Sequence, residues 1–303
     1  MSPENKKIFV IVVTYKGGRW YDRCFGSLRE SEIPLHVIAV DNSPGEEDAE
    51  YIRTHFPEVH IIKTNENLGF GKANNLGMRY ALDKDCDYVF LLNQDAWIEP
   101  NSIRVLVEVH QINPNLALLS PMHVFPGKSH LNILLGDVHH NYELLSDLYF
   151  GILKDYYDVR YVNAAAWLIP YETINVIGGF DPLFTHFGED DDYLNRLCYH
   201  RLPIVVVPKV RISHDHSNLI NPFSKDNNYR HQQCVLMDLL NLNKSININK
   251  ECFSMLMKVG KSVLKLNKKI VKIYWSDFLF ILRNKKKIEY SRKNNSECKR
   301  NWL

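Results

Sequence analysis

The stretch IFVIVVT, residues 8–14, decides the fold class of this chain. It is an almost unbroken run of apolar, mostly β-branched residues, which is typical of a strand buried on both faces of a parallel sheet. Two comparable runs follow, LHVIAVD at 35–41 and DYVFLLNQD at 87–95, and helix-like segments at 48–56 and 72–82 lie between them. This alternation predicts an α/β domain whose mainly parallel sheet is flanked by helices.

Polar residues stand at the carboxyl ends of these three runs, namely Thr14, Asp41 and the group Asn93–Asp95. In open parallel sheets, ligands bind just outside the carboxyl ends of the strands. Three strands would bring polar side chains to this edge independently, which is stronger evidence than any single residue. The sequence therefore predicts a ligand site at this edge of the sheet.

The second half of the chain is less regular. Residues 122–160 mix histidines, glycines and aromatic residues, and strand character returns at 161–170 and 203–214. The chain then becomes polar, rich in Asn and Lys, and helical in character. We therefore predict a main domain over 1–220 and a C-terminal helical, basic extension over 221–303.

The overall composition is that of an ordinary soluble globular protein, with 303 residues of which 45% are hydrophobic and 24% charged. No apolar run approaches the roughly 18–20 residues that cross a bilayer, and the apolar run that follows the polar first residues is too short for a signal peptide. The six cysteines are scattered without a CxxC pair. These features predict a cytoplasmic protein with reduced cysteines.

Charge is distributed unevenly along the chain. Residues 254–303 hold 14 Lys and Arg against 3 Asp and Glu, whereas the rest of the chain holds 23 against 32. Apolar residues and lysines alternate at helical spacing, which predicts a basic amphipathic helix over 254–282. Two interpretations are open: the helix docks on the main domain with a solvated lysine face, or it attaches to the anionic inner face of the cytoplasmic membrane. Nothing else in the sequence supports nucleic-acid binding.

Six motifs, in their order along the chain, resemble those of the family 2 glycosyltransferases, in particular the bacterial rhamnosyltransferase-like branch. They are VVTYK (12–16), VDNS (40–43), NENLGFGKANNLG (65–77), LLNQDA (91–96), GGFDPLFTHFGEDDDYLNRL (178–197) and VPKVRISH (207–214). The resemblance implies a GT-A fold, with a nucleotide-binding half at about 1–100 and an acceptor and catalytic half at about 101–220. It also implies inverting transfer of a rhamnose-like or other hexose from a dTDP- or UDP-linked donor to a surface-polysaccharide or lipid-linked glycan, with Mg²⁺ or Mn²⁺ as cofactor.

For the nucleotide base, the resemblance implies a pocket made by Thr14, Tyr15 and Asp41. The Asp41 carboxylate would accept a hydrogen bond from the imide N–H of a pyrimidine. The alternative for Asp41 is a turn residue, because the sequence Asp-Asn-Ser-Pro-Gly favours turns.

The glycine-rich stretch at 65–77 lacks GxGxxG spacing directly after the first strand, which excludes a dinucleotide-dependent dehydrogenase. The resemblance implies nucleotide contacts from Asn67, Gly69 and Lys72, and from Asn93 at the end of the third strand. The alternative is an ordinary loop that precedes a helix.

The metal site is expected at the same edge of the sheet. The resemblance implies that Asp95 holds the cation against the diphosphate, with His214 as a further ligand. Many family members carry Asp-x-Asp here, but this chain has Asn93 at the first position, so Asp95 must carry most of the metal binding. Gln94 stands where related sequences usually have proline. His216 is the alternative ligand because strand alternation puts it on the same face as His214, and a turn role for Asp95 is the non-functional alternative.

The run at 188–197 contains four carboxylates side by side. Helical spacing places Asp190 on the face of two leucines and pairs Asp192 with Arg196 on the solvated side. All four acids would also favour the positive end of the helix dipole. Only the resemblance makes Asp190 the general base that takes the proton of the acceptor hydroxyl.

Three further residues are candidates for contact with the sugar or the acceptor: Trp167, Glu189 and Asp191. A single tryptophan is more often a core residue, and the two acids otherwise serve as solvated partners of the helix dipole.

Two other functional classes remain as alternatives. A non-catalytic, nucleotide-sugar-binding relative would be expected to lack Asp95, Asp190 or His214, and all three are present. A nucleotidyltransferase would want a glycine-rich, basic loop directly after the first strand, where VVTYKGGRW offers only two glycines and one arginine.

Overall fold

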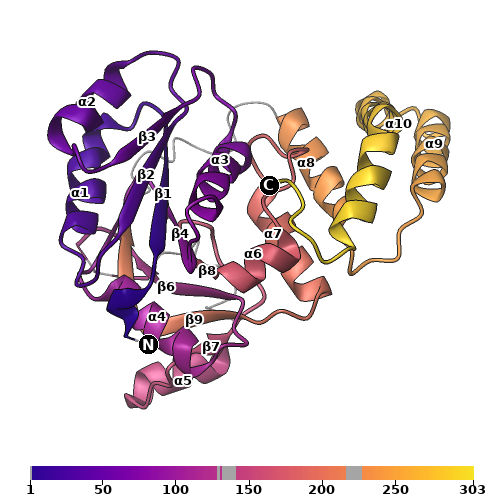
Figure 1. The fold of residues 1–303 in the computed structure, drawn as a ribbon. Helices are drawn as coiled ribbons and strands as arrows, with labels where there is room; N and C mark the ends of the chain where they lie inside the picture. Colours follow the sequence, from indigo (N-terminus) through magenta and orange to yellow (C-terminus); the bar gives the residue numbers. More distant parts are fainter. Residues whose placement is uncertain (1, 128–129, 132–140, 216–226) are drawn as a thin grey trace. The chain divides into compact units, whose positions relative to one another are not determined.

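The computed structural model describes residues 2–127, 130–131, 141–215 and 227–303 (Figure 1). The chain divides into two compact units. The first consists of Met1–Leu219 together with Lys299–Leu303, and the second consists of Ile220–Cys298.

The nucleotide-binding half predicted from the sequence is built on four parallel strands. They lie in the order β3 (His60–Lys63), β2 (His36–Asp41), β1 (Ile8–Thr14) and β4 (Tyr88–Asn93). All three neighbouring pairs are parallel. The strongly apolar runs of the sequence therefore form buried parallel strands, as predicted.

Beyond β4 the sheet becomes mixed. β8 (Ala166–Pro170) runs antiparallel to both β4 and β6 (Leu118–Val124), and β9 (Ile204–His214) runs parallel to β6. β5 (Ala96–Ile98) and β7 (Tyr157–Asp158) each pair antiparallel with β9. The α/β prediction is confirmed, and the parallel arrangement is concentrated in the first half of the sheet because β8 reverses the strand direction.

Helices cover both faces of the sheet in the first unit. They are α1 (Gly18–Arg29), α2 (Glu47–His55), α3 (Phe70–Leu82), α4 (Ser102–Ile112), α5 (Tyr142–Phe150), α6 (Tyr171–Ile177) and α7 (Glu189–Tyr199), and a short helix η1 (Pro3–Asn5) precedes them. Successive side chains of a strand point to opposite faces. Val10 and Val12 of β1 therefore pack with α1, α2 and α4, whereas Phe9 and Ile11 pack with α3, α6 and α7.

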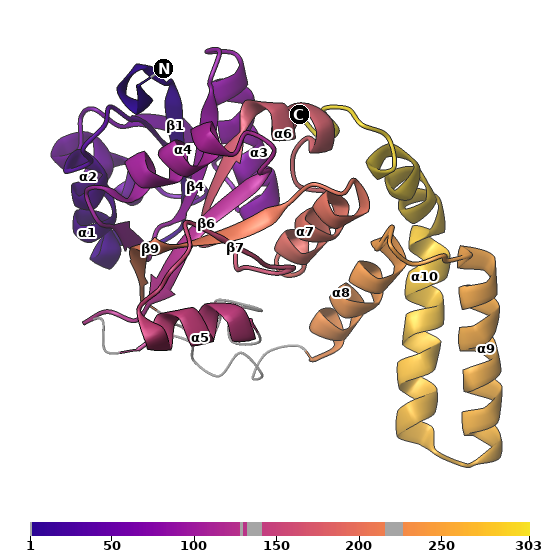
Figure 2. The ribbon, with the colours of Figure 1, turned by 90° about the horizontal axis from the view of Figure 1, so that it is seen from below.

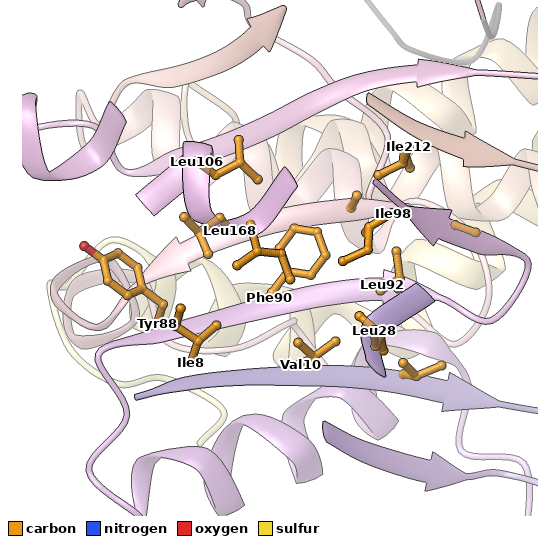
Figure 3. Close-up of a cluster of buried hydrophobic side chains, with 14 of the residues drawn as sticks. Ile8, Val10, Leu28, Tyr88, Phe90, Leu92, Ile98, Leu106, Leu168 and Ile212 are labelled. Carbon is orange, nitrogen blue, oxygen red and sulfur yellow. The ribbon is translucent and has the colours of Figure 1, made fainter. Parts of the chain in front are cut away.

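Figure 3 shows the first of these two clusters, in which Val10, Phe90 and Leu168 of three neighbouring strands meet Leu28 of α1 and Leu106 of α4. All five side chains are buried. Each such side chain contributes about 1.5–3 kcal/mol by leaving water, so this packing fixes the strand ends that carry the polar residues.

The second unit contains the helices α8 (Asn227–Leu240), α9 (Ile248–Leu264) and α10 (Lys268–Asn295), and α9 and α10 lie side by side as an antiparallel hairpin (Figure 2). The prediction of one amphipathic helix over 254–282 is therefore wrong at its centre. The helix ends at residue 264 because Leu266 adopts a left-handed conformation with φ of 51°. Asn267 then caps α10, its side chain accepting a hydrogen bond from the Ile270 N–H at 3.1 Å. In the part of the chain that the structure describes, no helix is long and apolar enough to cross a membrane.

The last five residues belong with the first unit, although the extension was predicted to run to residue 303. The Lys299 N–H donates to the carbonyl of Val176 at 3.1 Å, and the Gly179 N–H donates to the carbonyl of Asn301 at 2.8 Å. Gly178 has φ of 74°, and a Cβ there would clash with the Asn301 backbone. This segment therefore packs directly on the Gly178–Gly179 turn.

Candidate functional site

The polar strand ends meet at one edge of the sheet. Thr14 of β1 lies opposite Asp41 of β2, and Val13 lies opposite Asn93 of β4. The parallel register brings the three predicted polar positions onto neighbouring strands. The ligand edge predicted from the sequence is therefore formed.

A cleft of about 270 Å³ opens at this edge. Its lining comes from strand ends, from the start of α3 and from the loop before α7. The lining residues are Val13, Tyr15, Asn42, Asn67, Phe70, Asn93, Gln94, Asp95 and His186. Among these, Tyr15, Asn67, Asn93 and Asp95 were candidates from the sequence.

Asp41 and Thr14 are fully buried and are absent from the lining of the cleft. One Asp41 oxygen accepts from the Ser43 N–H at 2.9 Å, and the other lies 2.8 Å from the ammonium of Lys63. Asp41 therefore has a structural partner in this conformation. A base that hydrogen-bonds Asp41 would have to compete with Lys63, a partner that the sequence did not reveal.

Asn42 takes the exposed position that the sequence gave to Asp41. Its amide donates to the carbonyl of Gly69 at 3.2 Å, and its side-chain oxygen accepts from the Thr64 hydroxyl at 3.2 Å. Asn42 therefore ties the end of β2 to the glycine-rich loop, and it also faces the cleft.

Gln94 joins the two loops on either side of the cleft. Its Oε1 accepts from the Tyr15 N–H at 2.8 Å, and its Nε2 donates to the Tyr15 carbonyl at 3.2 Å. A proline at this position, as the resemblance would suggest, has no amide with which to make either bond. In this chain Gln94 therefore fixes the loop after β1 against the loop after β4.

Asp95 and His214 come together as the metal prediction requires. Their Oδ1 and Nε2 atoms are 3.2 Å apart, and Nδ2 of Asn93 lies 3.5 Å from the same imidazole nitrogen. β5 pairs with β9 so that Ala96 stands opposite His214, which explains the approach. His216 lies outside the described residues.

The donor set of this pair fits a divalent cation. A carboxylate oxygen and an imidazole nitrogen both ligate Mn²⁺ and Mg²⁺, and Asp95 faces the open cleft, so other coordination positions could take ligand oxygens. Within the described ranges, no group of three or more His, Cys, Asp and Glu could hold a metal ion. The chain therefore offers two protein ligands here, and the remainder would come from a bound ligand or from water.

The glycine-rich loop differs from its prediction in two respects. Gly69 has φ of 83°, and a Cβ there would clash with the carbonyl of Thr185, so the close approach is to the chain itself. Lys72 lines a separate hollow of about 620 Å³, together with Arg79 and Leu303. Asn67 does face the cleft, while its Oδ1 accepts from the Gly69 N–H at 2.9 Å.

The acidic run forms the first turn of α7, and the structure corrects its predicted exposure. Asp192 and Arg196 form an ion pair at 2.8 Å, as the spacing predicts, but both are buried, with Arg196 only 1% exposed. Arg196 also donates to the carbonyls of Ile177 and Gly179, each at 2.9 Å. Glu189 is buried as well and accepts from the Phe187 N–H at 2.6 Å, so it closes the turn before the helix.

The carboxyl groups of α7 have raised pKa values. Burial raises the pKa of Asp190, although hydrogen bonds from the Asp191 N–H at 3.0 Å and the Tyr161 hydroxyl at 3.1 Å oppose the shift. Burial and then the charge of Asp190 raise the pKa of Asp191 to about 7. Burial raises the pKa of Asp192 to about 6 against the opposing effect of Arg196. The cluster therefore holds protons more tightly than isolated carboxyls do.

Asp190 is half-buried and does not line the cleft. The loop that leads to α7 does reach the cleft through His186. Phe70, at the start of α3, lines the cleft and packs edge-on against Phe180 at 5.7 Å. The cleft and the start of α7 are therefore connected by packed side chains.

Trp167 is a core residue in this structure, which contradicts the predicted sugar contact. Its side chain has no exposed surface. The ring stacks on Phe180 at 6.2 Å and lies 5.7 Å from Tyr193. Such burial leaves it no surface with which to contact a sugar.

The sequence analysis missed several residues that line the cleft or support it. Asn42 and Phe70 each directly follow a residue that was chosen, so their proximity to the site was a usable signal. Gln94 was noted as unusual but was given no role. Lys63 and His186 reach the site through the pairing of β3 and through the loop before α7, and no local motif marks either one.

Comparison with known proteins identifies related sequences. The model of the family described as glycosyl transferase family 2 matches residues 9–163. The "dTDP-rhamnosyl transferase RfbF" of Shigella flexneri is 28% identical over 136 residues, which are 42% of this chain and 42% of that protein. The "N-acetylglucosaminyl-diphospho-decaprenol L-rhamnosyltransferase" of Mycobacterium tuberculosis is 24% identical over 229 residues, which are 68% of this chain and 75% of that protein.

A third relative and a solved structure extend the comparison. The "Low-salt glycan biosynthesis hexosyltransferase Agl10" of Haloferax volcanii is 33% identical over 113 residues, which are 37% of this chain and 35% of that protein. The chain thus spans less than half of the Shigella and Haloferax proteins. The solved structure described as "GalNAc-T7 with UDP, GalNAc and Mn2+" superimposes with a TM-score of 0.57 at 17% identity, covering 70% of this chain and 44% of that one. That likeness confirms the predicted GT-A fold.

Proposed function

The chain belongs to glycosyl transferase family 2, and from this premise we propose that it transfers a rhamnose-like or other hexose from a dTDP- or UDP-linked donor to a glycan acceptor, with inversion at the anomeric carbon. The donor class follows the printed names of the Shigella relative and of the structural neighbour. The glycosyltransferase activity itself is common to the relatives.

One observation carries the proposal: Asp95 and His214 stand 3.2 Å apart beside a cleft lined by Tyr15, Asn67 and Asn93. The cleft offers an aromatic ring and amide groups to a nucleoside. The ion-binding pair lies at the same edge, where a diphosphate would follow the nucleoside. The cofactor that fits the pair is Mg²⁺ or Mn²⁺. When bound, such a cation supplies positive charge that offsets the charge growing on the departing nucleoside diphosphate.

Asp190 is the proposed general base. The oxygen of an acceptor hydroxyl forms a bond to the anomeric carbon while the bond from that carbon to the diphosphate oxygen breaks, and the hydroxyl proton passes to the Asp190 carboxylate. Tyr161 holds one oxygen of Asp190 at 3.1 Å and thereby orients the carboxylate. The raised pKa of Asp190, which burial causes, makes it a better proton acceptor than an exposed aspartate.

The remaining side chains near this site are assigned supporting roles. Tyr15, Asn67 and Asn93 are proposed to contact the nucleotide, and Gln94 to fix the loop that carries Tyr15. Glu189 and Asp191 are proposed to act near the acceptor. The domain assignment follows, with a catalytic domain over 1–220 and a helical extension after it.

The acceptor is proposed to be a surface-polysaccharide or lipid-linked glycan, as the printed name of the Mycobacterium relative describes for that protein. A lipid-linked acceptor would be used at a membrane. We therefore include in the proposal a cytoplasmic protein that attaches to the inner face of the membrane through residues 254–303, whose basic character is described above.

The first test is the release of nucleoside diphosphate from a panel of dTDP- and UDP-linked sugars, measured with Mg²⁺, with Mn²⁺ and with EDTA. We expect release from at least one donor, loss of release in EDTA, and recovery when metal is restored. Release that EDTA leaves unchanged would contradict the metal assignment, and release from none of the pyrimidine donors would contradict the donor class.

The second test compares Asp190→Asn with Asp155→Asn. Loss of the base should lower kcat by about 10²–10⁴-fold, whereas the exposed Asp155, which pairs only with Lys209 on the surface, should leave kcat unchanged. Circular dichroism confirms that both variants are folded. A folded Asp190→Asn enzyme with near wild-type kcat would remove Asp190 from the mechanism.

A further inference from the structure

The turn that joins α9 to α10 exposes large apolar side chains. Leu264 is 85% exposed and Leu266 is 87% exposed. Val263, Ile270 and Ile273, which flank the turn, are also exposed. Figure 2 shows the two helices side by side, joined at one end by this turn. We call residues 263–273 the hairpin tip.

The backbone at Leu266 makes its side chain more unusual still. The Leu266 N–H donates to the Val263 carbonyl at 2.9 Å, and the Asn267 N–H donates to the Ser262 carbonyl at 3.1 Å, which is the hydrogen-bond pattern that closes a helix end. The residue at this position takes a left-handed conformation and is usually glycine, yet here it is a leucine with φ of 51°. A leucine is disfavoured at this position twice, by its backbone strain and by its exposure. The fold of the hairpin therefore does not explain why a leucine stands there.

Lysines surround the hairpin tip. They are Lys261, Lys265, Lys268, Lys269 and Lys272. Among the described residues, none of these five has an ion-pair or hydrogen-bond partner, and no Asp or Glu occurs between residues 252 and 276. Their summed charge is therefore uncompensated by nearby acids along the chain. Anionic surfaces attract such a cluster, with each lysine contributing separately to the attraction.

We propose that the hairpin tip inserts into the headgroup region of an anionic lipid bilayer, with Leu264 and Leu266 entering the acyl boundary and the lysines binding lipid phosphates. This pairing of apolar tip and cationic flanks is what an interfacial membrane element requires. Trp275, which is 45% exposed on α10, adds an aromatic side chain of the kind enriched at membrane interfaces. The inference specifies the membrane contact of the proposed function, but it does not depend on the transfer reaction.

A bilayer fits these observations better than a protein partner does. The apolar residues sit at a turn rather than in a groove, and the cations lie on both helices that flank it. A protein partner would need both an apolar pocket and acids placed for several separate lysines. An anionic bilayer presents apolar depth and negative charge over its whole surface.

The test is flotation of the full chain with vesicles of phosphatidylcholine alone and of phosphatidylcholine mixed with phosphatidylglycerol. We expect binding to the anionic vesicles that falls with added salt, and little binding to the neutral ones. The double variant Leu264→Ser, Leu266→Gly should lower partitioning on the order of tenfold or more, because two large side chains lose their burial in the bilayer. Exchange of the five lysines for glutamine should abolish the preference for anionic vesicles.

Two controls separate membrane binding from folding and from catalysis. Leu266→Gly should keep or raise the thermal midpoint, since glycine relieves the strained conformation, while still lowering partitioning. Ile112→Ser, at a side chain 75% exposed on α4, should change nothing. Donor hydrolysis without vesicles should be the same in wild type and tip variants, so that failure of the membrane inference is distinguishable from failure of the proposed reaction.

Three outcomes would overturn the inference. The first is partitioning of the double variant within twofold of wild type. The second is equal binding to neutral and anionic vesicles. The third is light scattering that shows a dimer converted to a monomer by the tip changes while vesicle binding persists, since the tip would then be an interface between copies of this chain.

Discussion

Replacing Arg196 by methionine should destabilise the first unit strongly, although the side chain touches no part of the cleft. Arg196 is buried with Asp192 at 2.8 Å and also donates to the carbonyls of Ile177 and Gly179. Methionine is of similar length, so the core stays filled. It leaves Asp192 buried without its cation and two carbonyls without a donor.

The magnitude follows from the burial of the pair. Removing one partner of a buried ion pair costs about 3–5 kcal/mol, which corresponds to a fall in Tm of about 6–20 °C for a unit of this size. The cost has an upper limit because the Asp192 carboxyl can take up a proton. Its pKa is about 6 with Arg196 present, and losing that cation raises it further. The variant should therefore lose more stability at pH 8 than at pH 6.

The assay is differential scanning calorimetry of wild type, Arg196→Met and the double variant that adds Asp192→Asn. The double variant should recover part of the loss, since no unpaired charge remains. Arg53→Met is the matched control: Arg53 pairs with Glu46 at 3.5 Å with both side chains more than half exposed, and such pairs contribute less than about 1 kcal/mol. If Arg196→Met melted within 2 °C of the control, the buried pair would not hold α7 as argued.

Three further changes test other parts of the first unit. Asp191→Asn should stabilise the fold increasingly as the pH rises from about 4 to 7: burial raises the pKa of Asp191 to about 7, so the folded state keeps a proton that the unfolded state releases, and stability falls through that range in wild type only, as thermal melts in a pH series would reveal. Gly178→Ala should lower stability by at least about 1 kcal/mol more than Gly151→Ala, because both have positive φ but only Gly178 abuts the Asn301 backbone; equal melting temperatures would count against the packing of that segment. Gln94→Ala removes two hydrogen bonds to the loop after β1, so it should raise the donor KM with a small effect on kcat, and an unchanged KM would argue that the loop is fixed by other contacts.

The strands were predictable because their signal is local. Buried parallel strands must be apolar on both faces, and IFVIVVT, LHVIAVD and DYVFLLNQD each carry that requirement within seven to nine residues. The meeting of Thr14, Asp41 and Asn93 at one edge follows from parallel register alone. The reversal at β8 was not predictable, because strand direction depends on how the chain returns to the sheet.

The environment of individual side chains was harder to predict. The spacing of Asp192 and Arg196 gave the pair correctly, but its burial depends on Ile177 and Gly179, which precede the helix and are brought against it by the fold. The break in the basic helix was missed for another reason. The apolar spacing continues through residue 266, and periodicity contains no information on the sign of φ.

The position of residues 299–303 has a consequence for biosynthesis. These residues leave the ribosome only after the whole of the second unit has been made, yet they belong to the first unit and pack on the Gly178–Gly179 turn. Domains usually fold in the order in which they are synthesised. Here the first unit must hold an incomplete turn while α8, α9 and α10 emerge. Its last contacts are therefore non-local ones, made late, and the nascent chain depends on the earlier β-sheet to remain folded in the meantime.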